Sequence, residues 1–377
     1  MASFNLIDRP WIPCIRLNGA RDELGLRDVL VQAQDIREIQ GASPLETAAV
    51  LRVLLVVLHR SCSMQGRTDW LTLWRSGRFD PAALDGYFAK WRHRFDLFDA
   101  QRPFFQVADD TQVGAPDPLN KIVHHIASDH APTLFDHTLA DNKAPILLTP
   151  ARAARAVLAT QYFGLGFQKF VLAPCARGVI CLVAGANLFE TLLLNFYPKD
   201  TVKSAIPDSG ADEPIWESEN AYRDRTMPDG LCDFWTWPNR KIKLFLNASG
   251  TAVERVAWAP GLRLEEDITD PMQRWWVDES SGWRVLRFDP DKALWRDSAT
   301  LLELPLEPHK SRPIGAVAWL SKLARFDHQF GAKVYRLVAF GMCSDRAELV
   351  FLRSVSYTHL RAHETPEHLV CRLLLEK

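Results

Sequence analysis

The chain has 377 residues, of which 47% are hydrophobic and 24% charged, as is ordinary for a globular protein. The formal net charge is −1 at pH 7, so no overall basic field indicates nucleic-acid binding, which would have to come from local patches or from a partner. The seven cysteines include no CxxC pair, which indicates neither a structural zinc site nor a disulfide framework and favours a cytoplasmic location.

The first residues carry no basic stretch followed by an apolar core, so they do not form a signal peptide. Residues 4–18 predict a short pair of strands or an extended N-terminal segment, with breaks at Pro10 and Pro13.

Residues 43–60, SPLETAAVLRVLLVVLHR, predict a helix with a clear start. Ser43 is a suitable N-cap, Pro44 suits the first turn, and Glu46 completes a capping box. The apolar run is short for a membrane span and contains Arg52, so we predict a buried core helix.

The rest of the chain predicts a mixture of helices and strands. Two helices are expected within 69–95, the second starting near Asp80 and Pro81, and another within 149–163, capped by Thr149. Further strands are expected within 179–185, 241–247, 282–289 and 334–342, with a helix over 315–326.

Two features of composition concern exposure. Residues 199–230 are polar and rich in Pro, Asp and Glu, which predicts a long surface loop. The thirteen tryptophans lie mostly within apolar runs, so we predict that they belong to the core rather than to an interaction surface.

One cluster of potential metal ligands lies within the sequence HHIASDHAPTLFDH: His124, His125, Asp129, His130, Asp136 and His137. Imidazole and carboxylate groups are good metal ligands, but no HExxH motif is present. We therefore favour a polar loop that docks on a partner. A metal-dependent phosphohydrolase is the alternative, and stoichiometric metal that is lost in His130→Ala would favour it.

The stretch QYFGLGFQKF contains Gly164 and Gly166. It is no dinucleotide fingerprint, because Lys169 replaces the third glycine and the stretch follows a helix rather than a strand. The missing Cβ atoms permit a close approach, and Lys169 and Arg177 carry charges that neutralise phosphates. A simple turn with surface charges remains equally open.

Several stretches in one order resemble the CasA family, the large subunit of the type I-E CRISPR surveillance complex Cascade. The resemblance runs in family order across residues 4–353. The stretches that carry it are FNLIDRPWIPC (4–14), FDLFDAQRPFFQV (95–107), PLNKIV (118–123), TLFDH (133–137), FGLG (163–166), NLFETLLLN (187–195), EPIWE (213–217) and FGMCSDRAE (340–348).

The resemblance implies an α+β fold, the large mixed N-terminal domain of the family, with the C-terminal four-helix bundle missing. It implies a non-catalytic subunit in antiviral defence that reads the protospacer-adjacent motif (PAM) and starts guide-directed unwinding. The implied partners are guide RNA, double-stranded target DNA, other Cascade subunits and the helicase–nuclease, with no membrane, metal or cofactor. A purely structural scaffold is a further alternative.

The family motifs also imply site residues. A PAM-reading glycine loop would comprise Gly164, Gly166, Phe167, Gln168 and Lys169; a loop that contacts the RNA 5′ handle and the backbone subunit would comprise Phe135, Asp136 and His137; and a duplex wedge would comprise Arg346 and Ala347. The family wedge has glutamine before the alanine, where this chain has arginine. The family's lysine finger aligns with residues 277–282, which contain no lysine; Arg274 and Arg284 are the nearest cations.

The sequence pattern changes abruptly after Arg353, where the last segment, residues 354–377, begins. It resembles a translated sequencing adapter in a single reading frame, interrupted only where the variable index falls. We therefore predict a native CasA-like region over 1–353 and a non-native tail over 354–377.

Overall fold

The computed structural model describes residues 3–123, 146–165, 172–203, 205–289, 291–297, 310–327, 329–330, 333–345 and 348–361. Its helices are α1 (Leu26–Val31), α2 (Pro44–Ser61), α3 (Arg67–Ser76), α4 (Pro81–Trp91), α6 (Pro150–Phe163), α7 (Leu188–Leu194), α8 (Leu231–Trp235) and α10 (Gly315–Phe326). Its strands are β1 (Ile12–Arg16), β2 (Arg21–Leu24), β3 (Ile36–Ile39), β4 (Asp117–Pro118), β5 (Ile180–Ala184), β6 (Arg240–Leu246), β7 (Val253–Pro260), β8 (Trp275–Asp278), β9 (Gly282–Val285), β10 (Ser311–Arg312), β11 (Val334–Asp345) and β12 (Glu348–Arg361). This mixture confirms the predicted α+β class.

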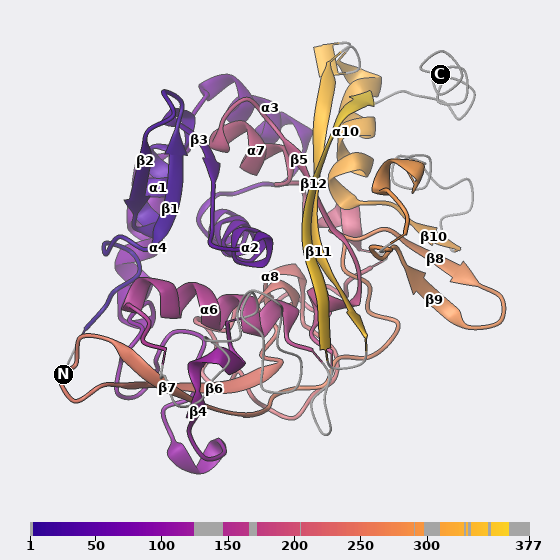
Figure 1. Cartoon of the computed structure of the whole chain (residues 1–377). Coiled ribbons are helices and arrows are strands. Elements are labelled where there is room, and N and C mark those ends of the chain that lie inside the picture. Colours follow the sequence, from indigo (N-terminus) through magenta and orange to yellow (C-terminus); the bar gives the residue numbers. More distant parts are fainter. Residues whose placement is uncertain are drawn as a thin grey trace.

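Helix α2 occupies the centre of the molecule (Figure 1). It begins as predicted: the Ser43 hydroxyl accepts the N–H of Glu46, and the Glu46 carboxylate accepts the N–H of Ala42. Its side chains from Leu45 to Leu58 are buried, apart from Thr47. Within the described ranges, no helix is long and apolar enough to cross a lipid bilayer.

The strands form four three-stranded antiparallel sheets, with strand orders β2-β1-β3, β10-β8-β9, β12-β11-β5 and β4-β7-β6. Figure 1 shows α2 between the first and third of them, with α6 between α2 and the sheet of β4, β6 and β7. Pro13 lies inside β1, so the predicted break there is wrong. Register pairs between β1 and β3 begin only at Cys14, so the missing N–H of Pro13 removes no bond of that ladder.

The remaining predicted elements are confirmed. Helices α3, α4, α6 and α10 and strands β5, β6, β9 and β11 all overlap the predicted segments. Asp80 caps α4 by accepting the N–H of Ala82, and Thr149 caps α6 by accepting the N–H of Arg152.

The segment of residues 205–230 differs from its prediction. It contains no helix or strand, as expected of a loop, but part of it is core. The Trp216 ring is buried and stacks on Phe104 with ring centroids 5.7 Å apart. The buried Glu217 carboxylate accepts bonds from Arg60 and from the hydroxyl of Tyr87. Polar composition misled the prediction because these polar groups are paired inside the protein.

The tryptophans confirm the core prediction. Within the described part of the chain, Trp11, Trp70, Trp216, Trp235, Trp237, Trp275 and Trp319 are buried, and Trp74, Trp91, Trp258, Trp276 and Trp283 are half-buried.

Candidate functional site

Most of the predicted site residues lie outside the described ranges. These are Gly166, Phe167, Gln168 and Lys169 of the glycine loop, Phe135, Asp136 and His137, the wedge residues Arg346 and Ala347, and the whole histidine cluster. Gly164 is described, together with the frame that holds both ends of the segment 166–171.

Gly164 ends helix α6 and is buried. Its φ of −55° is open to any residue, so conformation does not require glycine there. The lack of space does require glycine, because an added Cβ would lie 2.7 Å from the carbonyl oxygen of Thr160 and 3.2 Å from Nη2 of Arg240. The close approach at this glycine is therefore to the protein's own chain.

Two main-chain bonds close the base of the glycine loop. The N–H of Gly164 donates to the carbonyl of Thr160 at 3.0 Å, which completes the last turn of α6. The N–H of Ala173 donates to the carbonyl of Gly164 at 2.9 Å. The two ends of the segment 166–171 are thus tied to each other and to the helix.

Arg240, at the start of β6, lies behind this base. Its Nη2 donates to the carbonyl of Leu165 at 2.9 Å and its Nη1 to the carbonyl of Asn239 at 3.1 Å. Burial lowers the pKa of Arg240 to about 10, so the guanidinium still carries its charge at neutral pH. A full positive charge is therefore fixed beside Gly164 and Leu165, where the described chain leads into the loop.

Gln161 clamps the main chain of Arg240 from helix α6. Its Nε2 donates to the carbonyl of Arg240 at 2.6 Å, and its Oε1 accepts the N–H of Arg240 at 2.9 Å. The hydroxyl of Tyr222 donates to the same carbonyl at 2.9 Å. Sequence analysis missed Gln161, although a glutamine in the middle of a helix that is expected to be buried is a signal of a specific buried partner.

The other end of the loop is held by a buried ion pair. Arg52 of α2 donates Nη2 to the Asp270 carboxylate at 2.6 Å and Nη1 to Sγ of Cys175, which follows the loop. Burial raises the pKa of the Cys175 thiol, so the sulfur stays protonated and acts as packing rather than as a nucleophile.

The hairpin of β8 and β9, which contains the residues 277–282 where we expect the lysine finger, projects from the body of the molecule (Figure 1). In its turn, the Asp278 carboxylate accepts bonds from Ser280 and Ser281, which lower its pKa to about 2. Arg284 is exposed and donates to the hydroxyl of Ser281 at 2.7 Å, whereas Arg274 is buried. Of the two cations, Arg284 is therefore the accessible one.

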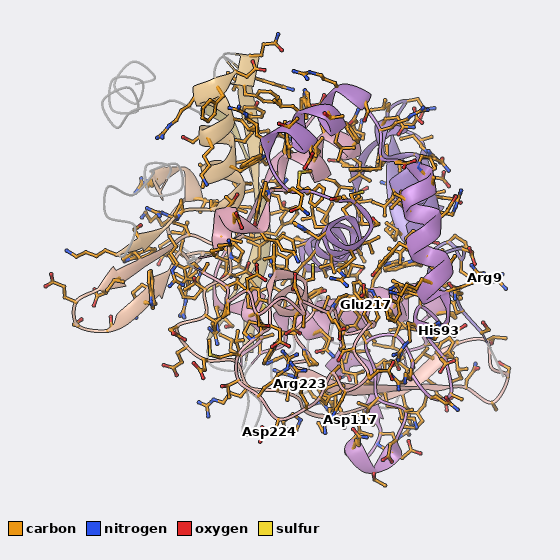
Figure 2. The ribbon with its side chains drawn as sticks, turned by 180° about the vertical axis from the view of Figure 1, so that it is seen from behind. Arg9, His93, Asp117, Glu217, Arg223 and Asp224 are labelled. Carbon is orange, nitrogen blue, oxygen red and sulfur yellow. The ribbon has the colours of Figure 1, made fainter. Side chains whose placement is uncertain are left out.

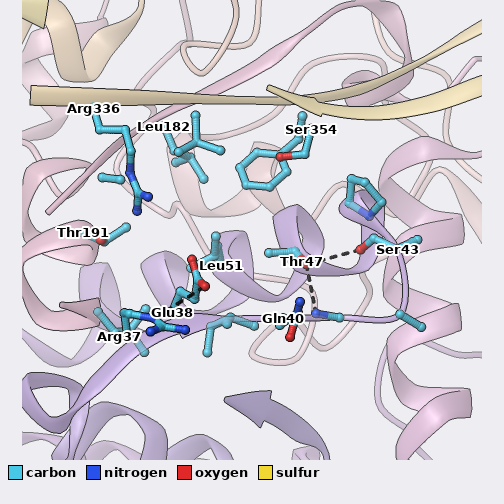
Figure 3. Close-up of a pocket in the computed structure, with 18 residues that line it drawn as sticks. Arg37, Glu38, Gln40, Ser43, Thr47, Leu51, Leu182, Thr191, Arg336 and Ser354 are labelled. Atoms are coloured by element: carbon cyan, nitrogen blue, oxygen red, sulfur yellow. Dashed lines mark hydrogen bonds and ion pairs between the residues drawn. The ribbon is translucent and has the colours of Figure 1, made fainter. Parts of the chain in front are cut away.

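A cavity of about 310 Å³ lies between the start of α2 and the strands β5 and β11. Figure 3 shows Arg336 extending into it toward Thr191, above the apolar side chain of Leu51. None of the predicted site residues lines this cavity. In the described part of the chain, no group of three or more His, Cys, Asp or Glu side chains is arranged to hold a metal ion.

Comparison with known proteins identifies relatives of the chain. Residues 5–367 match the family described as CRISPR-associated protein Cse1. A curated CasA/Cse1 protein of Thermus thermophilus is 36% identical over 320 residues, which are 80% of this chain and 61% of that relative. The chain thus spans less than two thirds of that relative's length.

Solved structures agree in fold. A crystal structure of CasA from Thermus thermophilus matches with a TM-score of 0.80 and 29% identity, over 100% of this chain and 76% of the other. A chain from a CRISPR RNA-guided surveillance complex matches with a TM-score of 0.81 over 98% of this chain and 78% of the other. Its identity is 22%, so this second match carries the fold alone.

Proposed function

The chain belongs to the CRISPR-associated Cse1 (CasA) family, and from that premise we propose that it serves as a non-catalytic subunit of a cytoplasmic Cascade surveillance complex. In this role it reads the PAM of invading duplex DNA, contacts the 5′ handle of the guide RNA, helps to start unwinding and recruits the helicase–nuclease. Guide pairing reads the target sequence, and the protein reads only the short motif.

The observation that carries this proposal is the frame at the base of the glycine loop. Gly164 and Ala173 are bonded to each other, and Arg240 lies beneath them with its charge intact. A loop that starts from fixed ends loses little conformational freedom when it binds, which favours affinity. The buried positive charge adds an attractive potential for the phosphates beside a minor groove.

Within this proposal the predicted residues have separate tasks. The glycine loop, with Gly166, Phe167, Gln168 and Lys169, approaches the minor groove. Phe135, Asp136 and His137 contact the RNA handle and a neighbouring subunit, and Arg346 with Ala347 forms the wedge. Arg346 suits a wedge because a guanidinium stacks on a base pair and attracts phosphate.

Reconstituted Cascade that contains this protein in full length tests the proposal. We expect duplex DNA with the cognate PAM to bind at least about 1.4 kcal/mol more tightly, or tenfold, than a duplex without it. Lys169→Gln is expected to weaken binding of the PAM duplex and to reduce its salt dependence. Lys322→Gln, at an exposed position on α10, is the matched control. Equal binding of both duplexes by the wild-type complex would overturn the proposed role.

The tail boundary is a separate proposal. We place the end of the native sequence at Arg353, although strand β12 runs from Glu348 to Arg361 and the family match extends to residue 367. Sequencing the source DNA across codon 353 tests it. A reading frame that continues into other coding sequence supports an adapter-derived tail, and a read that returns the codons of residues 354–377 refutes it.

A further inference from the structure

A second cationic feature is built around Arg94 and Arg102. A cavity of about 340 Å³ is lined by residues from 101–109 and 215–222, by Arg94 and by Gln112. Figure 2 labels Glu217 and Arg223, which flank residues 218–222 of this lining in the sequence. The cavity is within the size range of ordinary small-ligand sites.

Two arginines of this cavity share one carboxylate. Arg94 donates Nη2 to Oε1 of Glu219 at 2.6 Å, and Arg102 pairs through its Nη2 with the other carboxylate oxygen. Arg102 also places Nη1 3.5 Å from the main-chain carbonyl of Glu219. Two guanidinium groups thus converge on two oxygens of one anion, an arrangement that phosphate oxygens also accept.

Arg94 is short of acceptors. Its side chain is only 5% exposed, and its buried Nε has no hydrogen-bond partner among the described residues. Burial, followed by repulsion from Arg102, lowers the pKa of Arg94, although Glu219 and Asp99 oppose this. A buried cation beside a second cation gains from any additional negative charge.

The nearby carboxylates do not fill this need. Asp109 also lines the cavity, but its carboxylate accepts the N–H and the hydroxyl of Thr111. The Asp99 carboxylate accepts the N–H groups of Gln101 and Arg102. Both negative charges are therefore already stabilised by local donors.

Glu219 holds its position weakly. Its side chain is 75% exposed, and an exposed carboxylate gains little from an ion pair because water and salt screen the attraction. A phosphate, with more charge and more acceptor oxygens, can take its place.

We propose that Arg94 and Arg102 form a phosphate-binding site that the Glu219 carboxylate occupies when no ligand is bound. The ligand is a phosphate group, either free or within a nucleic-acid backbone. Gln101 and Asn220, whose side chains carry amide groups, also line the cavity. The site does not depend on the proposed reading of the PAM and is testable on this chain alone.

Calorimetric titration of the purified chain with inorganic phosphate at constant ionic strength tests the site. We expect Glu219→Gln to bind phosphate roughly tenfold more tightly than the wild type, because the internal competitor has lost its charge. Glu213→Gln is the matched control, since it removes an exposed charge from the same segment without touching the cavity. A purely structural ion pair predicts no gain of affinity in either variant.

Arg102→Gln is expected to change the phosphate affinity in the opposite direction. Arg102 is 42% exposed, so its replacement is compatible with folding, and phosphate binding should fall at least tenfold. A single-stranded oligothymidylate without terminal phosphate separates the sources: Arg102-dependent binding of it indicates a backbone phosphate, and binding of inorganic phosphate alone indicates a free one. The site is refuted if Glu219→Gln and the wild type bind phosphate equally or not at all.

Discussion

At the scale of single residues, the half-buried His59 shows how the surroundings of a ring set its charge state. Its ring packs edge-on against Phe196 and Trp235, with ring centroids 4.5 and 5.5 Å away. Its Nε2 is covered and has no hydrogen-bond partner among the described residues. Burial, with a smaller effect of Lys199, lowers the pKa of His59 to about 3. The folded protein therefore keeps this imidazole neutral.

This charge state predicts how stability depends on pH. Below the ordinary histidine pKa of 6.5, the unfolded chain binds a proton at His59 that the folded chain does not. The free energy of unfolding should therefore fall as the pH drops from 6.5, by up to about 1.4 kcal/mol per unit from this residue. Denaturant unfolding at pH 7 and pH 5 measures it. The loss should be smaller in His59→Gln and unchanged in His93→Gln, and equal losses in all three proteins would contradict the assignment.

At the scale of elements, the end of α6 and the start of β6 are built as one unit. The glycine that ends the helix leaves room for Arg240, and Gln161 one turn earlier binds the main chain of the same arginine. The segment 166–171 starts from this unit. Any change that moves the helix end also moves the base of the loop.

Gly164→Ala tests this coupling. The new Cβ would meet the Thr160 carbonyl at 2.7 Å, so the last turn of α6 must shift, and we expect a loss of about 1–3 kcal/mol in unfolding free energy. Gly86→Ala in α4 is the control, because nothing lies within 4 Å of its Cβ position and a helical alanine stabilises by about 0.5–1 kcal/mol. Opposite signs in the two variants support the packed frame, and a neutral Gly164→Ala would contradict it.

The same elements show what sequence can and cannot predict here. The starts of α2 and α6 depend on caps and prolines within a few residues, so the local pattern predicts both correctly. The partner of Gly164 lies on β6, far along the chain, and no local pattern indicates that contact. From the sequence, Gly164 and Gly166 indicate only that some group comes close to the main chain. The fold identifies that group, at Gly164, as the side chain of Arg240.

At the scale of the whole molecule, long-range ion pairs connect segments without regular structure to the core. Arg52 of α2 binds Asp270, and Arg60 of the same helix binds Glu217. Both acceptors lie outside helices and strands, yet both are buried. The central helix thus fixes the chain at Glu217, within the segment whose polar composition resembles that of a solvent-exposed loop, and at Asp270, shortly before β8.

Limited proteolysis tests whether residues 205–230 are held to the core or behave as a solvent-exposed loop. Arg225 donates Nη2 to Asp233 at 2.7 Å and stacks over the Trp237 ring at 4.6 Å, so the bond after Arg225 should resist trypsin in the native protein. Asp233→Asn weakens this anchor and should accelerate cleavage there, whereas Asp224→Asn, at an exposed position in Figure 2, should not. Mass spectrometry of a digestion time course measures the rates. Rapid cleavage after Arg225 in the wild type would mean that this segment opens freely and that its buried contacts do not hold it to the core.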